Sequence, residues 1–133
     1  MFKKLLLSLI VVVPVIAQAE WVEITRTNEK KYYLNNTYIK DNSDIVQYWV
    51  KSIIYNDLTK DGQSVGDYSM QNFSGKCNSR ETAFFAFTDY YNDGRVLRSD
   101  SRSYASYSVA VPESVGEFLL LAACAVVEVR RNQ

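Results

Sequence analysis

Histidine is absent from the 133-residue sequence. Because histidine is the usual general base near neutral pH and the commonest metal ligand, its absence excludes a Ser/His/Asp or Cys/His catalytic set and the usual zinc sites. Carboxylates are present, but their spacing singles out no pair for acid–base chemistry. We therefore expect a protein that is not an enzyme and that holds no metal or other cofactor.

An excess of basic charge is also missing. The chain has 15 basic and 15 acidic residues, and without Lys3 and Lys4 it has 13 against 15, a net charge near −2. This balance excludes the broadly basic surface that nucleic-acid binding requires. No nucleic-acid partner is expected.

Hydrophobic runs long enough to span a membrane are not present. The runs from Leu5 to Ile16 and from Phe118 to Val127 are both shorter than the about 20 residues that a spanning helix needs. The first run follows a basic pair, "KK", and precedes the small-residue triplet "AQA". This layout is typical of a secretory signal peptide over residues 1–19, with cleavage before Glu20. An uncleaved anchor is the alternative.

Residues 20–133 then form the mature chain, about 114 residues, which is enough for one domain with its own core. No cysteine lies near the cleavage site, so no lipoprotein signal is visible. We expect an exported protein that is periplasmic, displayed on the cell surface or secreted.

Cysteine is scarce, with one residue at Cys77 and one at Cys124. In an oxidising compartment two cysteines usually pair. Closing a loop of about 48 residues stabilises the fold by on the order of 4 kcal/mol in the chain-entropy model. The alternative is a reactive thiol. Such a thiol needs an activating base, usually a histidine, and the chain has none. We predict a structural disulfide, which leaves soft metals without thiolate ligands.

The second cysteine ends a predicted helix. Ser114 and Glu117 form an S-x-x-E capping box, in which the serine hydroxyl accepts from the Glu117 amide and the carboxylate reaches back. The periodicity places Phe118, Leu121 and Ala125 on one face of this helix, and Leu120 and Cys124 on the adjoining face. The sequence becomes β-branched after Cys124, so we expect the helix to end there and residues 130–133 to be solvated.

The rest of the mature chain reads as strands and turns. Val46, Tyr48, Val50 and Ile54 alternate along the strongest strand and should share one face, with Trp49 on the other. Strands are expected at residues 21–25, 31–35 (ended by an Asn-Asn pair), 45–55, 68–73, 82–91, 95–99 and 104–111. Residues 75–79 form either a turn or a bulge. The predicted fold is α+β: a curved antiparallel meander of about six or seven strands with one short C-terminal helix linked to it by the disulfide.

Several stretches occur in a fixed order along the chain. A tryptophan directly follows the signal, and then come "YYLN", "YWV", "YS", "CNSR", an aromatic strand ending in "YY" and "VPESVGEFLLLAAC". With these stretches the sequence resembles the surface-adhesin protein E-like family of Gram-negative bacteria over roughly residues 20–124. The most specific part is a mid-chain cysteine combined with a P-x-S-x-x-E-x-L helix that ends in a cysteine.

The resemblance implies a curved antiparallel sheet whose C-terminal helix is bound by a Cys77–Cys124 disulfide. It also implies a surface lipoprotein that binds host matrix or serum proteins. The sequence departs from that pattern because no lipid-attachment cysteine is visible, so a periplasmic location stays open.

Two further segments are candidate sites. The stretch "DLTKDG" at residues 57–62 matches the start of a calcium loop, but Tyr68 stands where that loop needs glutamate, so a polar connection is expected. A set of aromatic and basic residues near one hairpin is a candidate partner-contact surface; ordinary strand composition and a solvated face are the alternatives. The set is Tyr90, Tyr91, Arg95, Arg98 and Arg102, with Lys76 and Arg80 nearby.

Two functions follow as hypotheses. The first is an exported, adhesin-like module that binds a protein partner, whether a host matrix or serum protein or a protein of the envelope. The second is a periplasmic structural or accessory protein without host contact. A third option, an enzyme inhibitor, would use the loop from Asn56 to Gly66 as its contact. The sequence indicates neither the partner's identity nor the oligomeric state.

Overall fold

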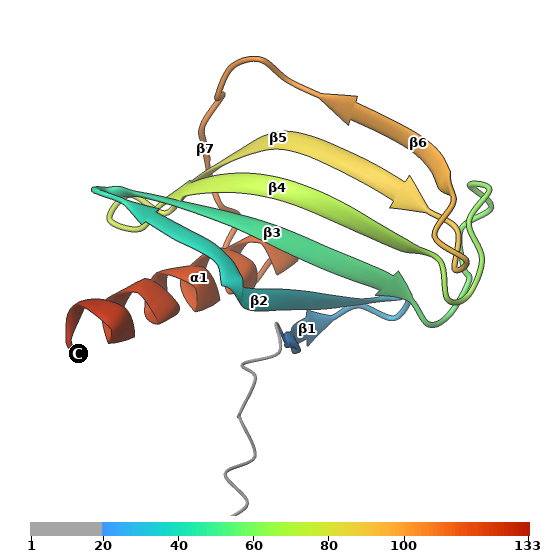
Figure 1. The fold of residues 1–133 in the computed structure, drawn as a ribbon, viewed down its shortest axis with the longest axis horizontal. Coiled ribbons are helices and arrows are strands. Elements are labelled where there is room, and N and C mark those ends of the chain that lie inside the picture. Colours follow the sequence, from blue (N-terminus) through green and yellow to red (C-terminus); the bar gives the residue numbers. More distant parts are fainter. Residues whose placement is uncertain (1–19) are drawn as a thin grey trace, which may run out of the picture.

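The computed structural model describes residues 20–133; the predicted signal peptide lies outside this range. One sheet of seven strands and one C-terminal helix, α1 (Val115–Arg131), make up the domain (Figure 1). The strands are β1 (Trp21–Arg26), β2 (Lys30–Asn42), β3 (Ile45–Ile54), β4 (Tyr68–Lys76), β5 (Glu81–Tyr90), β6 (Val96–Ser101) and β7 (Ser108–Val109). Strands β1 to β6 are hydrogen-bonded in sequence order, and β7 pairs with the start of β5. The predicted α+β meander with a C-terminal helix is confirmed.

The core lies between α1 and one face of the sheet, which we call the inner face (Figure 1). Val46, Tyr48, Val50 and Ile54 of β3 are each at most 2% exposed, as their alternation predicts. The helix packs against β1, β2 and β3 and buries Leu119, Leu120, Ala123 and Val127. The opposite side of the sheet, the outer face, carries no helix.

Cys77 and Cys124 form the predicted disulfide, with a Cα–Cα distance of 5.9 Å. Cys77 directly follows the end of β4, and residues 77–80 form a turn, which resolves the choice between a turn and a bulge. Two residues before Cys77, Gly75 lets α1 approach the sheet closely. A Cβ atom at Gly75 would lie 2.3 Å from Leu120 Cδ1, so no larger residue fits there without movement.

Two predicted strands differ most from the structure, and β4 also continues three residues past its predicted end at Phe73. Strand β2 does not end at Asn35 but continues to Asn42, because the Asn-Asn pair forms an irregularity between Leu34 and Ile39 instead of a turn. There the Asn35 side chain accepts from the Thr37 amide at 3.0 Å. The predicted strand at 104–111 is reduced to β7, and Tyr107 beside it donates its hydroxyl to Ser74.

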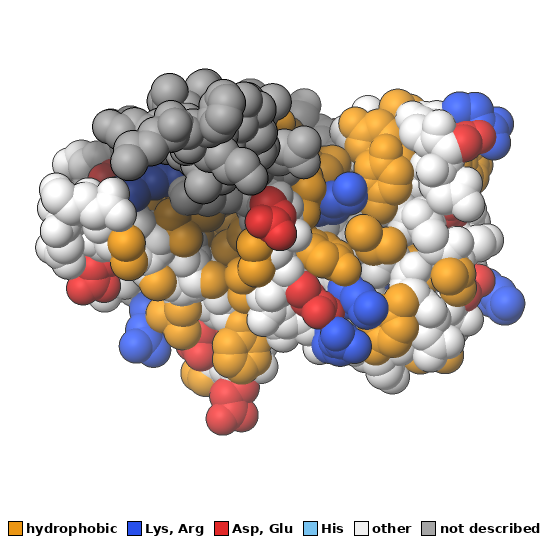
Figure 2. Space-filling model, turned by 60° about the horizontal axis from the view of Figure 1, so that its bottom comes forward, with side chains coloured by type: hydrophobic (Ala, Val, Ile, Leu, Met, Phe, Trp, Pro, Cys, Tyr) orange, Lys and Arg blue, Asp and Glu red, His pale blue; other side chains and the backbone are white. Residues whose placement is uncertain are grey.

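The helix ends later than predicted, and of its two predicted apolar faces the one with Leu120 is buried. The helix continues seven residues past Cys124, to Arg131, because Val127 packs on the sheet and favours the helical state despite its branched side chain. Phe118 and Leu121 are 44% and 39% exposed, so they lie away from the core. Hydrophobic side chains accordingly reach the surface on the helix side of the molecule (Figure 2).

Residues 130–133 are exposed, as predicted, but two of their side chains also bind the sheet. Arg130 donates to the backbone carbonyl of Ile39 at 2.6 Å. Arg131 donates to both carboxylate oxygens of Asp41, at 2.9 and 2.7 Å. The last turn is therefore bound to β2, about 90 residues away along the chain.

We predict that Gly75→Ala lowers the free energy of unfolding by about 1–3 kcal/mol, because the added methyl group displaces Leu120 from a packed core. Urea denaturation of residues 20–133 measures this. Gly116→Ala is the matched control: its Cβ would meet nothing nearer than Ser114 Oγ at 3.8 Å, so it should be neutral or stabilising by up to about 1 kcal/mol. Equal stability of the two variants would contradict the close approach at Gly75.

Candidate binding surface

The outer face of the sheet collects large aromatic side chains from five strands. Trp21 of β1 stacks on Tyr38 of β2, with ring centroids 5.7 Å apart. Tyr68 of β4 stacks on Tyr90 of β5 at 4.9 Å. Such stacked pairs are stabilising beyond the area they bury, so the rings hold one another in place on an open face.

A shallow hollow of about 300 Å³ lies among these rings. We call it the aromatic hollow, and its lining is Trp21, Tyr38, Trp49, Met70 and Tyr90. Trp49 and Met70 lie on the outer face because their neighbours Tyr48 and Ser69 are buried on the inner one. The hollow is thus walled by rings and includes a thioether, an apolar and adaptable surface.

Lys51 lies beside the aromatic hollow. Its ammonium is 5.8 Å from the centroid of the Trp21 ring and 5.0 Å from that of Tyr68. These are cation–π distances. In residues 20–133 no carboxylate lies within ion-pair distance of this ammonium, so its positive charge is not neutralised by the fold.

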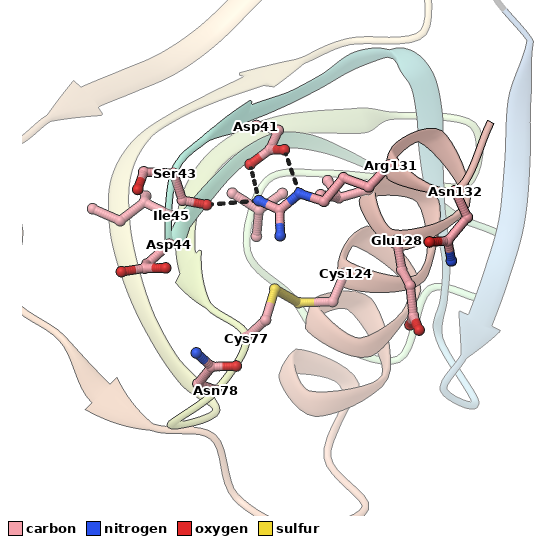
Figure 3. Close-up of a pocket in the computed structure, with 12 residues that line it drawn as sticks. Asp41, Ser43, Asp44, Ile45, Cys77, Asn78, Cys124, Glu128, Arg131 and Asn132 are labelled. Atoms are coloured by element: carbon pink, nitrogen blue, oxygen red, sulfur yellow. Dashed lines mark hydrogen bonds and ion pairs between the residues drawn. A yellow bond between two sulfur atoms is a disulfide. The ribbon is translucent and has the colours of Figure 1, made fainter.

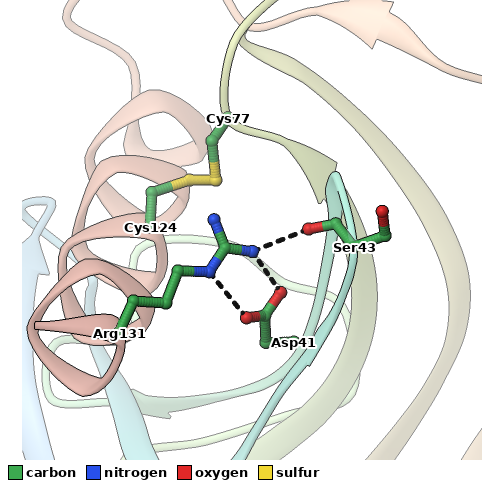
Figure 4. The surroundings of a disulfide bond; sticks show 5 residues. All are labelled: Asp41, Ser43, Cys77, Cys124 and Arg131. Atoms are coloured by element: carbon green, nitrogen blue, oxygen red, sulfur yellow. Dashed lines mark hydrogen bonds and ion pairs between the residues drawn. A yellow bond between two sulfur atoms is a disulfide. The ribbon is translucent and has the colours of Figure 1, made fainter. Parts of the chain in front are cut away.

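A second hollow, of about 390 Å³, lies between the end of α1 and the β2–β3 turn, with the disulfide in its wall (Figure 3). Arg131 extends across it and donates to Asp41 and to the carbonyl of Ser43 at 2.7 Å (Figure 4). Hydrogen bonding to the Asp41 carboxylate raises the pKa of Arg131. Arg131, Asp41 and the Ser43 carbonyl bind one another across this hollow and so fasten the end of the helix to the β2–β3 turn.

The sequence matches the family model of surface-adhesin protein E over residues 21–125. The chain belongs to the surface-adhesin protein E family. The match includes both cysteines and every residue of the aromatic hollow, and it ends before Arg130 and Arg131. No curated protein and no solved structure is significantly similar to the chain.

The structure divides the five residues predicted as a contact surface between the two faces and one hairpin of this adhesin E domain. Tyr90 lines the aromatic hollow, while the guanidinium of Arg95 lies 4.9 Å from the centroid of the Tyr91 ring at the β5–β6 hairpin. Arg98 forms an ion pair with Asp89 at 2.6 Å, and Arg102 lies 5.6 Å from the centroid of the Phe84 ring. Asp89 pairs with Ser69 and Phe84 pairs with Phe73 across β4 and β5. Ser69 and Phe73 in turn pair with buried residues of β3, so Asp89 and Phe84 belong to the inner face.

The helix cap is formed by Ser114, whose hydroxyl accepts from the Glu117 amide at 3.2 Å. The Glu117 carboxylate accepts from the Glu113 amide, one residue before the position that the capping box implies.

The loop resembling a calcium site makes internal contacts instead. Asp61 accepts from the Gln63 amide at 3.1 Å through its side chain, and Thr59 donates to Glu29. Across residues 20–133, no group of three or more acidic or thiol side chains is placed to hold a metal ion.

In the same range, no helix is long and apolar enough to cross a membrane.

Sequence reasoning did not identify Lys51 or the tryptophans as site residues. A signal was present, because Trp49 and Lys51 alternate with the buried residues of β3 and so had to share the outer face. The alternation does not give the pairing register of the strands. It is this register that places Trp21, Tyr38 and Met70 beside Trp49 and Lys51.

We predict that iodide quenches tryptophan fluorescence of the mature domain more than caesium does. Trp21 and Trp49, the two tryptophans of the chain, both line the aromatic hollow, and the nearby Lys51 ammonium attracts anions and repels cations. Lys51→Met should remove most of the difference, and the control Lys60→Met, in an exposed loop, should leave it unchanged. Equal quenching by both ions in the unmodified domain would contradict an open, positively charged hollow.

Proposed function

We propose that this chain is an exported, non-enzymatic module that binds a protein partner through the outer face of its sheet. The observation that carries the proposal is the aromatic hollow. Tryptophan and tyrosine dominate the energetically important positions of protein interfaces, because they offer large apolar area with little conformational entropy to lose.

Family membership supports the same class of function. The family takes its name from a surface adhesin, which favours an exported protein that acts by binding and not by catalysis. Host matrix or serum proteins are the partners this predicts.

A second candidate is a periplasmic accessory protein that binds an envelope protein with the same surface. Cys77 and Cys124 are joined in the disulfide, so neither thiol is free for lipid attachment. This supports the accessory-protein candidate, which needs no lipid anchor. Surface labelling of intact cells, with N-terminal sequencing of the mature protein, separates the two candidates: an adhesin is labelled, and an accessory protein is not.

We predict that the mature domain retains a specific partner from serum, matrix or envelope extract, and that Tyr38→Ala weakens this binding about tenfold or more, as for a residue at an interface centre. Phe118→Ala is the matched control, because Phe118 is also an aromatic residue that is 44% exposed, but on the helix side. Retention of no partner from any extract would refute the proposal. So would a loss of binding in Phe118→Ala and not in Tyr38→Ala.

A further inference from the structure

Basic side chains outnumber acidic ones on the outer face, although residues 20–133 as a whole carry slightly more acidic groups. The strands place lysines on this face next to outer-face residues of β3: Lys31 pairs with Ile53, Lys40 with Gln47 and Lys76 with Ile45. With Lys51 of β3 itself, these four residues form what we call the lysine strip. The carboxylates at outer-face positions of the strands are Glu23 and Glu81.

Neither carboxylate forms an ion pair with the lysine strip, although Glu81 stands opposite Lys76 in the strand register. Glu23 is paired with Arg26 at 2.9 Å, and Glu81 accepts a hydrogen bond from the Ser79 hydroxyl at 2.6 Å. Each ion pair within residues 20–133 uses an arginine and none uses a lysine.

Three ammonium groups of the strip lie against aromatic rings instead. Lys31 lies 5.4 Å from the centroid of Tyr55 and Lys76 lies 4.3 Å from that of Tyr107, in addition to Lys51 between Trp21 and Tyr68. A ring attracts the cation without cancelling its charge. These lysines are therefore positioned by the fold and remain able to pair with an anion.

The lysine strip runs along β3 with the aromatic hollow near its middle. The partners of Lys76 and Lys31 on β3, Ile45 and Ile53, are eight residues apart, about 27 Å at the rise of a β-strand. Trp49 of the hollow lies halfway between them. An extended segment of eight or nine residues would cover this length, with its central side chain over the hollow.

We propose that the outer face binds an extended acidic segment of a partner protein, with one apolar or aromatic side chain in the aromatic hollow and carboxylates on both sides facing the lysine strip. This inference rests on the proposed function and specifies the chemistry of its partner. Charge complementarity selects an anionic segment. The rings and the thioether of Met70 select a peptide over a sulfated glycan, which has no apolar side chain to place in the hollow.

The test uses a capped nonapeptide with a central phenylalanine flanked by glutamates and serines, titrated into the mature domain at low salt and followed by tryptophan emission and calorimetry. We expect the peptide with glutamine in place of glutamate to bind at least tenfold more weakly, because it cannot pair with the ammonium groups. The peptide with alanine in place of phenylalanine should also bind at least tenfold more weakly. Affinity for the acidic peptide should fall as salt rises.

Variants of the domain locate the contact. Lys51→Met should weaken acidic-peptide binding about fivefold or more and Lys51→Arg should retain it, while Lys60→Met serves as the control with unchanged affinity. Equal binding of the glutamine peptide, unchanged affinity in Lys51→Met, or binding of a sulfated oligosaccharide in preference to the peptide would overturn the inference.

The outcome is separable from that for the proposed function. A partner that is captured in a Tyr38-dependent manner, but whose binding is insensitive to salt and to Lys51→Met, refutes the acidic segment and leaves the binding module standing. Failure to capture any partner refutes the binding module, whatever the peptides do.

Discussion

The attachment of α1 to the inner face is the contact on which the rest of the structure depends. Leu120 is fully buried over Gly75, where the missing side chain lets the helix approach the strand. Beside it the Cys77–Cys124 disulfide fixes the same helix to the same strand end. At its C-terminal end, Arg130 and Arg131 bind β2. Because helices in proteins owe most of their stability to tertiary packing, these contacts explain why this 17-residue helix forms and where it lies.

A domain with one sheet and one helix can cover only one face of the sheet. With α1 on the inner face, the outer face has no element of residues 20–133 packed along its centre, and its side chains stabilise one another through ring stacking and cation–π contacts. The arrangement that forms the core on the inner face thus leaves aromatic rings and positive charge on the outer face, where a partner can bind them.

The sequence was sufficient for features that depend on neighbouring residues. The alternation along β3, the two cysteines and the Ser114 cap each identified an element or a link that the structure contains. It was insufficient where distant residues decide the outcome. Strand β2 continues past its Asn-Asn pair because Ile39 enters the core. Helix α1 continues past Cys124 because Val127 packs on the sheet and Arg131 pairs with Asp41. The aromatic hollow draws on five strands, so only the pairing register could reveal it.

The most direct test of this account is the stability of the mature domain with and without reductant, together with a thiol count on the unfolded, non-reduced protein. With the disulfide fixing α1 to β4, the account predicts no free thiol and a decrease in the free energy of unfolding of about 2–4 kcal/mol on reduction. Two free thiols, or a urea midpoint that does not change with reductant, would show that packing alone holds the helix and would contradict the account.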